Sequence, residues 1–121
     1  MRTVLTVAAL AVALAGGVAA QDRVYLEGEG VKNPVLVKGV KPSYTGGAIR
    51  RRVQGTVELT AVVLKDGSVG DVAIKRSLDE ELDQEAITAT KKWEFKPGTK
   101  DGEPVNVRVT IVHTFSLRDK H

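Results

Sequence analysis

Apolar and polar side chains alternate most regularly near the C-terminus. From residue 105 to residue 117, apolar residues occupy nearly all odd-numbered positions, whereas polar residues occupy most even-numbered ones. A period of two residues is that of a β-strand with one buried face. The pattern therefore predicts a long strand whose inward side chains are Val105, Val107, Val109, Ile111, Phe115 and Leu117.

A second alternating stretch lies in the middle of the chain and predicts a β-hairpin. Residues 56–64 alternate until Val62 and Leu64, which make the end of this strand apolar on both faces, so we expect both faces to be covered there. Asp66-Gly67 follows and favours a tight primed turn, because Gly accepts the positive φ that such a turn needs. Residues 69–75 form the returning strand.

Helical spacing follows the hairpin. Four apolar residues recur at intervals of four, three and four positions, which places them along one face of a helix over about 80–93. They are Leu82, Ala86, Ala89 and Trp93. The start of this helix offers two caps, a capping box between Ser77 and Glu80 or a single cap by Asp79.

A shorter helix is expected earlier, over 42–53, with Ser43 or Thr45 as its cap. The arginines at 50–52 fall in its last turn, where cations interact favourably with the negative end of the helix dipole. The alternative interpretation of these arginines is a basic patch for an acidic partner.

The elements assemble into an α+β fold, a small antiparallel three-stranded sheet with two helices packed on one face. The helix at 80–93 carries the chain back along the sheet, and Pro97-Gly98 and Asp101-Gly102 are expected to turn it into the last strand. That strand should pair with the first strand of the hairpin, giving the spatial order second, first, third. The last strand is then an edge, which is either covered within the chain or recruits a peptide.

The first twenty residues have the pattern of a secretory signal peptide. Arg2 precedes a long apolar run, and small residues lead to a cleavage site expected after Ala20. An uncleaved membrane anchor is the alternative, although this run is short and rich in Ala and Gly. We therefore expect a signal peptide at 1–20, an extended arm at 21–40 that lends a short strand, and one domain at 41–118.

Composition excludes several classes of function. The chain has no Cys, so it has neither disulfides nor thiolate metal sites, and its net charge of +3 is far from that of a nucleic-acid binder. We expect His113 to be a partly buried, hydrogen-bonded core residue, because no nucleophile or carboxylate is predictably near it. No phosphate loop or metal-ligand spacing is present. The sequence predicts a binding protein without catalytic residues, metal, cofactor, nucleic-acid partner or small-molecule substrate.

An ordered set of short motifs carries a family resemblance. They are Pro42-Ser43-Tyr44, Gly55-Thr56-Val57, Asp66-Gly67, Leu82-Asp83 with Ala86, Trp93-Glu94-Phe95-Lys96-Pro97 and Gly102-Glu103-Pro104-Val105. With these motifs, the chain from residue 41 to residue 117 resembles the C-terminal domain of the TonB energy-transducer family. Thr45 stands where the family usually has a proline after the tyrosine.

The resemblance implies a location and a partner. It implies a periplasmic domain that binds a peptide of an outer-membrane TonB-dependent receptor by strand addition, or another envelope protein. Carried onto this chain, the pairing edge is 107–115, and Pro42 and Tyr44 lie near the receptor. The partner-binding residues implied are Val107, Arg108, Val109, Thr110, Ile111, Val112, His113, Pro42 and Tyr44.

The shortness of the chain suggests a free-standing periplasmic version of this domain rather than an anchored transducer, since it lacks a long Pro-rich linker. The competing hypothesis is an envelope scaffold or self-associating protein, a homodimer for instance, in which the same edge strand pairs with another copy of the chain or with the arm at 24–37.

Overall fold

The computed structural model describes residues 23–119, and the predicted signal peptide at 1–20 lies outside the described residues. Its main sheet has five strands, in the order β1-β7-β3-β4, with β6 also paired to β7. A second sheet joins β2 and β5. The strands are β1 Val24–Leu26, β2 Val35–Lys38, β3 Gly55–Val63, β4 Val69–Arg76, β5 Glu94–Lys96, β6 Gly98–Lys100 and β7 Glu103–Phe115.

The centre of the sheet is the predicted antiparallel trio. β7 pairs with β3 along the whole of β3, from Gly55 opposite Phe115 to Val63 opposite Val107. β4 pairs antiparallel on the other side of β3. The predicted α+β class and the order second, first, third are confirmed. The three-stranded description was incomplete, because β1, β2, β5 and β6 are short segments without a long alternating pattern.

One face of the sheet is buried, as the alternation predicted. Val57, Leu59 and Val63 of β3 and Val107 of β7 are completely buried. The end of β3 is buried on both faces, since Val62 between two core residues is only 4% exposed. Alternate residues of β7 on the opposite face, Arg108 to Thr114, are exposed.

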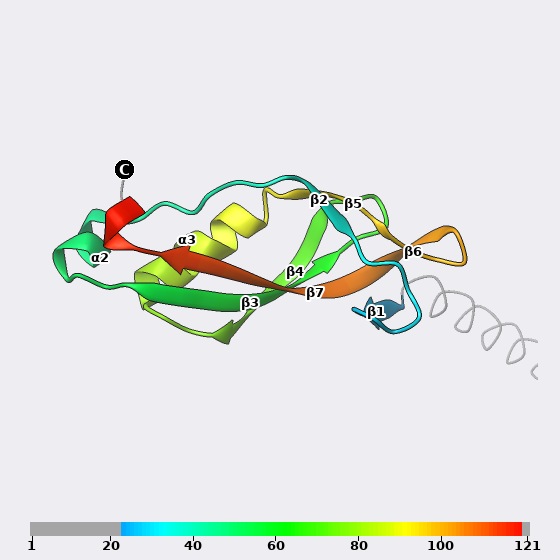
Figure 1. Ribbon diagram of the computed structural model, residues 1–121, viewed down its shortest axis with the longest axis horizontal. Coiled ribbons are helices and arrows are strands. Elements are labelled where there is room, and N and C mark those ends of the chain that lie inside the picture. The colour runs from blue at the N-terminus through cyan, green and yellow to red at the C-terminus, as the bar shows by residue number, and fades with distance from the viewer. Residues whose placement is uncertain (1–22, 120–121) are drawn as a thin grey trace, which may run out of the picture.

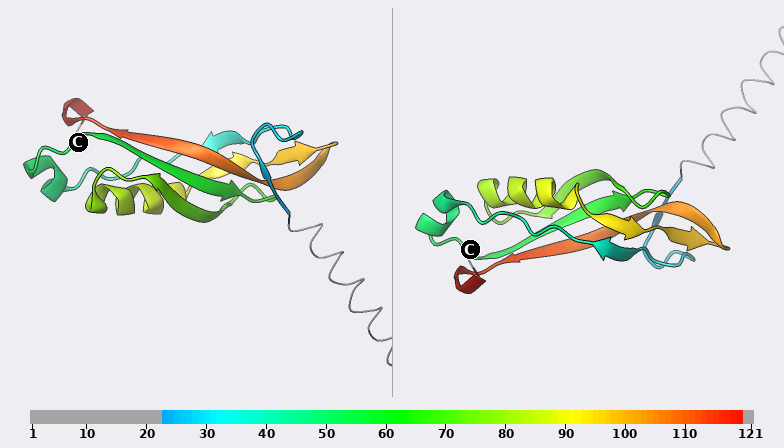
Figure 2. Two further views of the ribbon diagram at one scale, coloured as in Figure 1. Left: turned by 90° about the horizontal axis from the view of Figure 1, so that it is seen from below. Right: turned by 90° about the horizontal axis from the view of Figure 1, so that it is seen from above.

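The helix α3, Glu80–Thr90, packs on the buried face against β3 and β4 (Figure 2). Asp79 is its N-cap, and its carboxylate accepts hydrogen bonds from the backbone N–H groups of Glu81 and Leu82. The capping box does not form, because the Ser77 hydroxyl donates to Asp83 instead. α3 ends three residues before Trp93, so the predicted helix was too long.

The helix α2 is also shorter than predicted and spans Gly46–Arg50. Thr45 is its N-cap, and its hydroxyl accepts from the backbone of Ala48 and donates to Glu81 at 2.6 Å. Arg52, with a φ of 59°, ends the helical conformation. The chain at 42–44 is extended rather than helical. α2 lies beside the start of α3, at the end of the molecule where β7 finishes (Figure 1).

The two turns of the main sheet differ from each other. At Asp101-Gly102 both residues have positive φ, 52° and 84°, which is the primed turn of a two-residue hairpin between β6 and β7. At Asp66-Gly67 only Gly67 has positive φ, and Leu64 pairs with Ser68 around a three-residue loop. The predicted primed turn at Asp66-Gly67 is therefore wrong, because the loop is one residue longer and a left-handed Gly closes it.

The predicted turn at Pro97-Gly98 is also wrong. Gly98 begins β6, which pairs with β7 from Val105. A Cβ atom at Gly98 would lie 2.7 Å from Val107 Cγ2 and 2.8 Å from the Lys32 carbonyl oxygen. Glycine is therefore required here for close approach between segments, not for reversal of the chain.

Trp93 occupies the space between α3, β7 and the arm. Its ring packs edge-on against His113 of β7 at 5.3 Å and lies 6.0 Å from the ring of Phe95. Its indole N–H donates to the Val40 carbonyl oxygen at 2.8 Å. Trp93 thus fixes the point at which the chain leaves β2 and passes along α3 toward Tyr44.

Candidate functional site

The edge of β7 that faces away from β3, hereafter the outer edge, carries the candidate site. The direction of its backbone groups follows from one contact, the hydrogen bond from Thr110 N–H to the Glu27 carboxylate at 3.2 Å. Glu27 follows β1, which lies on the side of β7 opposite β3. Since backbone groups alternate along a strand, the N–H and C=O groups of even-numbered residues face the outer edge and those of odd-numbered residues face β3.

Part of the outer edge is paired within the chain. β1 runs parallel to β7, with Val24, Tyr25 and Leu26 opposite residues 106–108. At residues 106–108 the edge is therefore covered within the chain, which is one of the two expected outcomes, and the arm supplies the strand. Within residues 23–119, no strand pairs with the outer edge beyond Arg108.

The predicted residues of β7 divide into two groups by direction. The backbone groups of Thr110 and Val112 point toward the outer edge, and their side chains lie on the exposed face of the sheet, where Val112 is 54% exposed. Thr114 belongs to the same group and was missing from the predicted set. Sequence alternation shows which residues share a face, but only the register with β3 and β1 shows which backbone groups point outward.

The odd-numbered members of the predicted set point into the protein. These are Val107, Val109, Ile111 and His113, all at most 7% exposed. Their backbone groups face β3, so neither their side chains nor their hydrogen-bonding groups meet a strand added at the outer edge. They position the edge and do not contact what binds there.

His113 is a core residue, as expected from the sequence. Its Nε2 lies 2.8 Å from the hydroxyl oxygen of Thr90, which is completely buried. The Thr90 hydroxyl itself donates to the Ala86 carbonyl oxygen at 2.8 Å. Because that hydroxyl hydrogen is already used, Nε2 carries the hydrogen and donates to Thr90. Burial lowers the pKa of His113, so the imidazole is neutral at pH 7.

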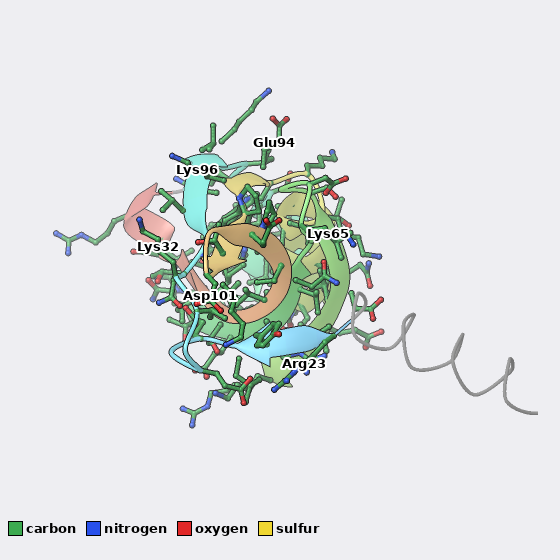
Figure 3. The ribbon with its side chains drawn as sticks, turned by 90° about the vertical axis from the view of Figure 1, so that its right-hand side faces the viewer. Arg23, Lys32, Lys65, Glu94, Lys96 and Asp101 are labelled. Atoms are coloured by element: carbon green, nitrogen blue, oxygen red, sulfur yellow. The ribbon has the colours of Figure 1, made fainter. Side chains whose placement is uncertain are left out.

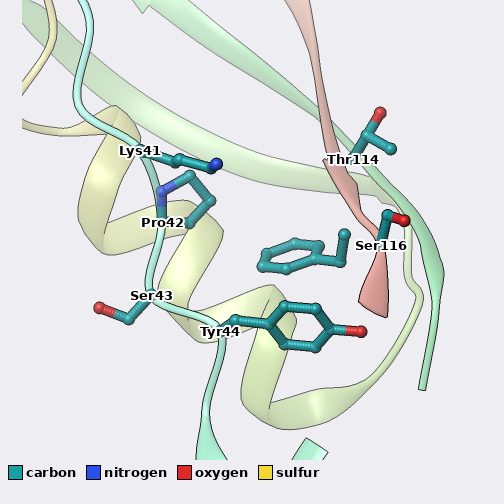
Figure 4. A pocket seen from close by; sticks show the side chains of 7 residues that line it. Lys41, Pro42, Ser43, Tyr44, Thr114 and Ser116 are labelled. Carbon is teal, nitrogen blue, oxygen red and sulfur yellow. The ribbon is translucent and has the colours of Figure 1, made fainter. Parts of the chain in front are cut away.

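A pocket of about 440 Å³ lies at the end of the outer edge. Figure 4 shows Lys41, Pro42, Ser43 and Tyr44 on one side of this pocket and Thr114 and Ser116 on the other. The Tyr44 ring packs edge-on against Phe115 at 5.4 Å, and its hydroxyl donates to the Val53 carbonyl oxygen. The structure therefore brings Pro42 and Tyr44 beside the end of β7.

Among the arginines at 50–52, Arg51 has a structural explanation. Arg51 bonds to Asp79 at 2.7 Å and to Glu81 at 3.3 Å, joining α2 to the start of α3. The hydrogen bond from Arg51 holds the pKa of Asp79 below its usual value. Basic residues elsewhere are dispersed. At the opposite end of the molecule, Arg23, Lys32, Lys65 and Lys96 spread around the rim together with Glu94 and Asp101 (Figure 3).

Two negative findings apply to the part of the chain that the structure describes. Residues 23–119 contain no cluster of His, Asp and Glu that could hold a metal ion. In the same range, no helix is both long and apolar enough to cross a membrane.

Comparison with known proteins gives consistent matches. The family model described as Gram-negative bacterial TonB protein C-terminal matches residues 40–117. Protein TonB of Xanthomonas campestris pv. campestris is 36% identical over 77 residues, which cover 63% of this chain and 34% of that protein. Protein TonB of Vibrio cholerae is 36% identical over 89 residues, covering 72% of this chain and 36% of that protein. This chain thus spans about a third of the length of these relatives.

The fold is similar as well. The solution NMR structure of the Pseudomonas aeruginosa TonB CTD matches with a TM-score of 0.60 and 23% sequence identity, over 78% of this chain and 94% of that one. The family match covers the two helices, the central hairpin and β7, together with Pro42 and Tyr44. The chain belongs to the TonB C-terminal domain family.

Proposed function

We propose that this chain is a periplasmic protein-binding module that pairs with an extended peptide of an outer-membrane receptor in TonB-dependent transport. The peptide adds as a strand to the outer edge of β7. The observation that carries the proposal is the stretch 110–114 of that edge, which lacks a strand partner within the described residues and leads into the pocket of Pro42 and Tyr44. The periplasmic location is supported by the signal-peptide pattern at 1–20.

Binding rather than catalysis fits the residues of this site. Val112 and Thr114 offer outward backbone N–H and C=O groups, and Thr110 offers its C=O group while its N–H bonds to Glu27; with short side chains, these residues suit main-chain pairing. The only described histidine, His113, is buried and hydrogen-bonded to Thr90. Membership of the TonB family supports the transport context, and receptor recognition is the part of the proposal that needs experiment.

Proline substitution at an outward position tests the proposal. Val112→Pro removes one outward N–H group and leaves the hydrogen bonds between β7 and β3 in place, and edge strands tolerate proline there. Val112→Thr is the matched control, because it keeps the N–H group and the branched shape. The probes are synthetic peptides from the N-terminal segments of TonB-dependent outer-membrane receptors, with binding measured by calorimetry.

We expect wild type and Val112→Thr to bind at least one receptor peptide with similar affinity. Val112→Pro should stay folded by circular dichroism and bind the same peptide at least about tenfold more weakly, because the proline removes a hydrogen bond and its ring obstructs the incoming strand. Absence of binding by wild type, or equal binding by the proline variant, would exclude strand addition at this edge.

Self-association is the second candidate, and one observation favours it. Among residues 23–119, β2 pairs with β5 and with no other strand, and its residues Val35, Leu36 and Val37 are 60%, 44% and 69% exposed. Exposed apolar edge strands tend to pair with other chains. Sedimentation velocity over a concentration series should then reveal a dimer that Val35→Lys/Val37→Lys abolishes. A monomer at all concentrations would argue against this function.

A further inference from the structure

The arm that contains β1 occupies the start of the same outer edge. Val24–Leu26 is hydrogen-bonded in parallel to residues 106–108. The next residue, Glu27, makes one further contact with the outer edge, since its carboxylate accepts a hydrogen bond from the outward N–H of Thr110. The side chain of Glu27 thus takes the place that the carbonyl group of a longer strand would take.

The arm leaves the edge directly after this contact. Glu29 N–H bonds to the Leu26 carbonyl oxygen at 3.1 Å, and the Glu29 carboxylate accepts from Leu26 N–H at 3.1 Å. Gly28, with a φ of 77°, completes the turn. The chain therefore turns away where the open stretch begins, and Glu27 is its last contact with the outer edge.

Few interactions hold the first part of the arm, residues 23–30, in place. Its ladder is three residues long, and Leu26 is 52% exposed. Tyr25 is half-buried against the core, with the Arg23 guanidinium 4.5 Å and the Lys100 ammonium 5.6 Å from its ring centre. Segments with few buried contacts open at a small fraction of the free energy of global unfolding. Residues 23–30 can thus detach while β3, β4 and β7 stay paired. The rest of the arm stays attached through the backbone bonds between Lys32 and Thr99 and the pairing of β2 with β5.

We propose that Val24 to Glu27 form a built-in strand that competes with the partner for the outer edge of β7. This inference rests on the proposed function for the identity of the partner, a receptor peptide in extended conformation. A peptide that pairs with Thr110, Val112 and Thr114 displaces Glu27, and one that continues toward Asn106 displaces β1 too. Its apparent affinity is reduced by the fraction of molecules in which the arm is docked.

Hydrogen exchange tests the occupation of the edge without any partner. In wild type, the Thr110 amide should exchange more slowly than those of Val112 and Thr114, although all three face outward. Glu27→Ala should accelerate exchange at Thr110 several-fold and leave Ile111, whose amide faces β3, unchanged. Glu103→Ala is the matched control, since it removes a carboxylate from β7 that does not touch the arm.

Two results would overturn the occupation of the edge. One is a Thr110 amide that exchanges as fast as that of Val112 in wild type. The other is Glu27→Ala leaving Thr110 unchanged. Acceleration at Ile111 together with Thr110 would indicate loosening of the whole sheet rather than release of the arm, and it would also count against the inference.

A reversible cross-link tests the competition. Leu26 and Arg108 are direct partners in the parallel ladder, and adjacent strands lie within the span of a disulfide. The chain has no Cys of its own, so Leu26→Cys/Arg108→Cys yields one defined bridge. With a receptor N-terminal peptide as probe, the oxidised protein should bind more weakly than the same protein after reduction. Glu27→Ala should bind about threefold to tenfold more tightly than wild type, the factor that one exposed hydrogen bond supplies.

The outcomes separate this inference from the proposed function. If the peptide binds and neither the bridge nor Glu27→Ala alters its affinity, the edge is the binding site but the arm is no competitor. If the peptide binds no form, including Glu27→Ala, the proposed function and the competition both fail, and hydrogen exchange alone reports whether the arm occupies the edge.

Discussion

Replacement of Thr90 by Val provides a sharp test of the buried polar pair beneath β7. The substitution keeps the branched shape and removes only the hydroxyl that accepts the hydrogen of His113 Nε2. The Ala86 carbonyl loses the Thr90 hydroxyl as well, but it lies within α3, where the backbone N–H of residue 90 remains available to it. The main consequence is therefore a buried imidazole N–H without a partner.

The expected magnitude follows from the burial of both residues. Thr90 is completely buried and His113 is 6% exposed, so water cannot replace the lost acceptor without a rearrangement. An unsatisfied buried donor costs about 1–3 kcal/mol. In a domain of this size, about 2 kcal/mol corresponds to a decrease in Tm of roughly 8–16 °C. His113→Phe removes the donor and should cost less, since the Thr90 hydroxyl keeps its bond to Ala86.

Urea unfolding at pH 7, followed by the fluorescence of Trp93, measures these free energies. The double variant Thr90→Val/His113→Phe completes a thermodynamic cycle, and it should be more stable than Thr90→Val alone because no donor is left unpaired. A Thr90→Val protein within about 0.3 kcal/mol of wild type, well under the cost of an unpaired donor, would refute the assignment of the hydrogen to Nε2. Equal losses for Thr90→Val and the double variant would show that packing, not hydrogen bonding, is responsible.

Three further predictions concern the pH dependence of stability and the contacts made by Trp93 and Asp79. Burial lowers the pKa of His113, so the unfolded chain binds a proton at this residue first as the pH falls below about 6.5. The free energy of unfolding therefore decreases as the pH falls toward the lowered pKa of the folded state. His113→Phe should lose less stability between pH 7 and pH 5 than wild type, and equal losses would contradict this. Trp93→Ala should lower the free energy of unfolding by about 3 kcal/mol, as for a truncated core aromatic, and circular dichroism measures this loss. A variant that stays fully stable but no longer binds receptor peptides would instead assign Trp93 to the binding surface. Asp79→Ala should lower Tm more than Asp79→Asn, because Asn still caps α3 and loses only the charge opposite Arg51, and equal Tm values would attribute the stabilisation to the ion pair.

The central hairpin and β7 were predictable because their strands have long alternating patterns that match one buried face. Val57, Leu59 and Val107 belong to that pattern, and all three are completely buried. The arm was expected to lend a strand, and β1 and β2 both form within it. The sequence left open whether the edge of the last strand pairs with the arm or with another chain, because three apolar residues fit any free edge. The tertiary structure shows that β1 pairs with β7.

The predicted C-terminal end of α3 was wrong for a local reason. Trp93 continues the apolar stripe of α3, yet the chain leaves the helix so that the indole can reach both Val40 and His113. The apolar stripe therefore predicted the burial of its residues correctly but predicted a helix that is too long. Gly98 was similarly interpreted as a turn, whereas contacts with Val107 and Lys32, distant in sequence, are what exclude a side chain there.

Within the candidate site, the sequence located the strand but not the groups that face a partner. Alternation identified Val109 and Ile111 as buried and Thr110 and Val112 as exposed. The direction of the backbone groups depends on register, which one contact between Glu27 and Thr110 reveals. Family resemblance alone assigned Pro42 and Tyr44, which no local pattern distinguishes from other residues of an extended segment.

The length of the open edge limits what strand pairing alone can achieve. In the described part of β7, the residues beyond β1 whose backbone groups face the outer edge are Thr110, Val112 and Thr114. Each hydrogen bond to them contributes about 0.5–1.5 kcal/mol net, whereas association costs at least about 4 kcal/mol in lost freedom. Main-chain pairing over this stretch therefore barely offsets the cost of association. A partner with useful affinity must either place a side chain in the pocket of Pro42 and Tyr44 or extend its pairing by displacing the arm, so the pocket and the arm decide which peptides bind.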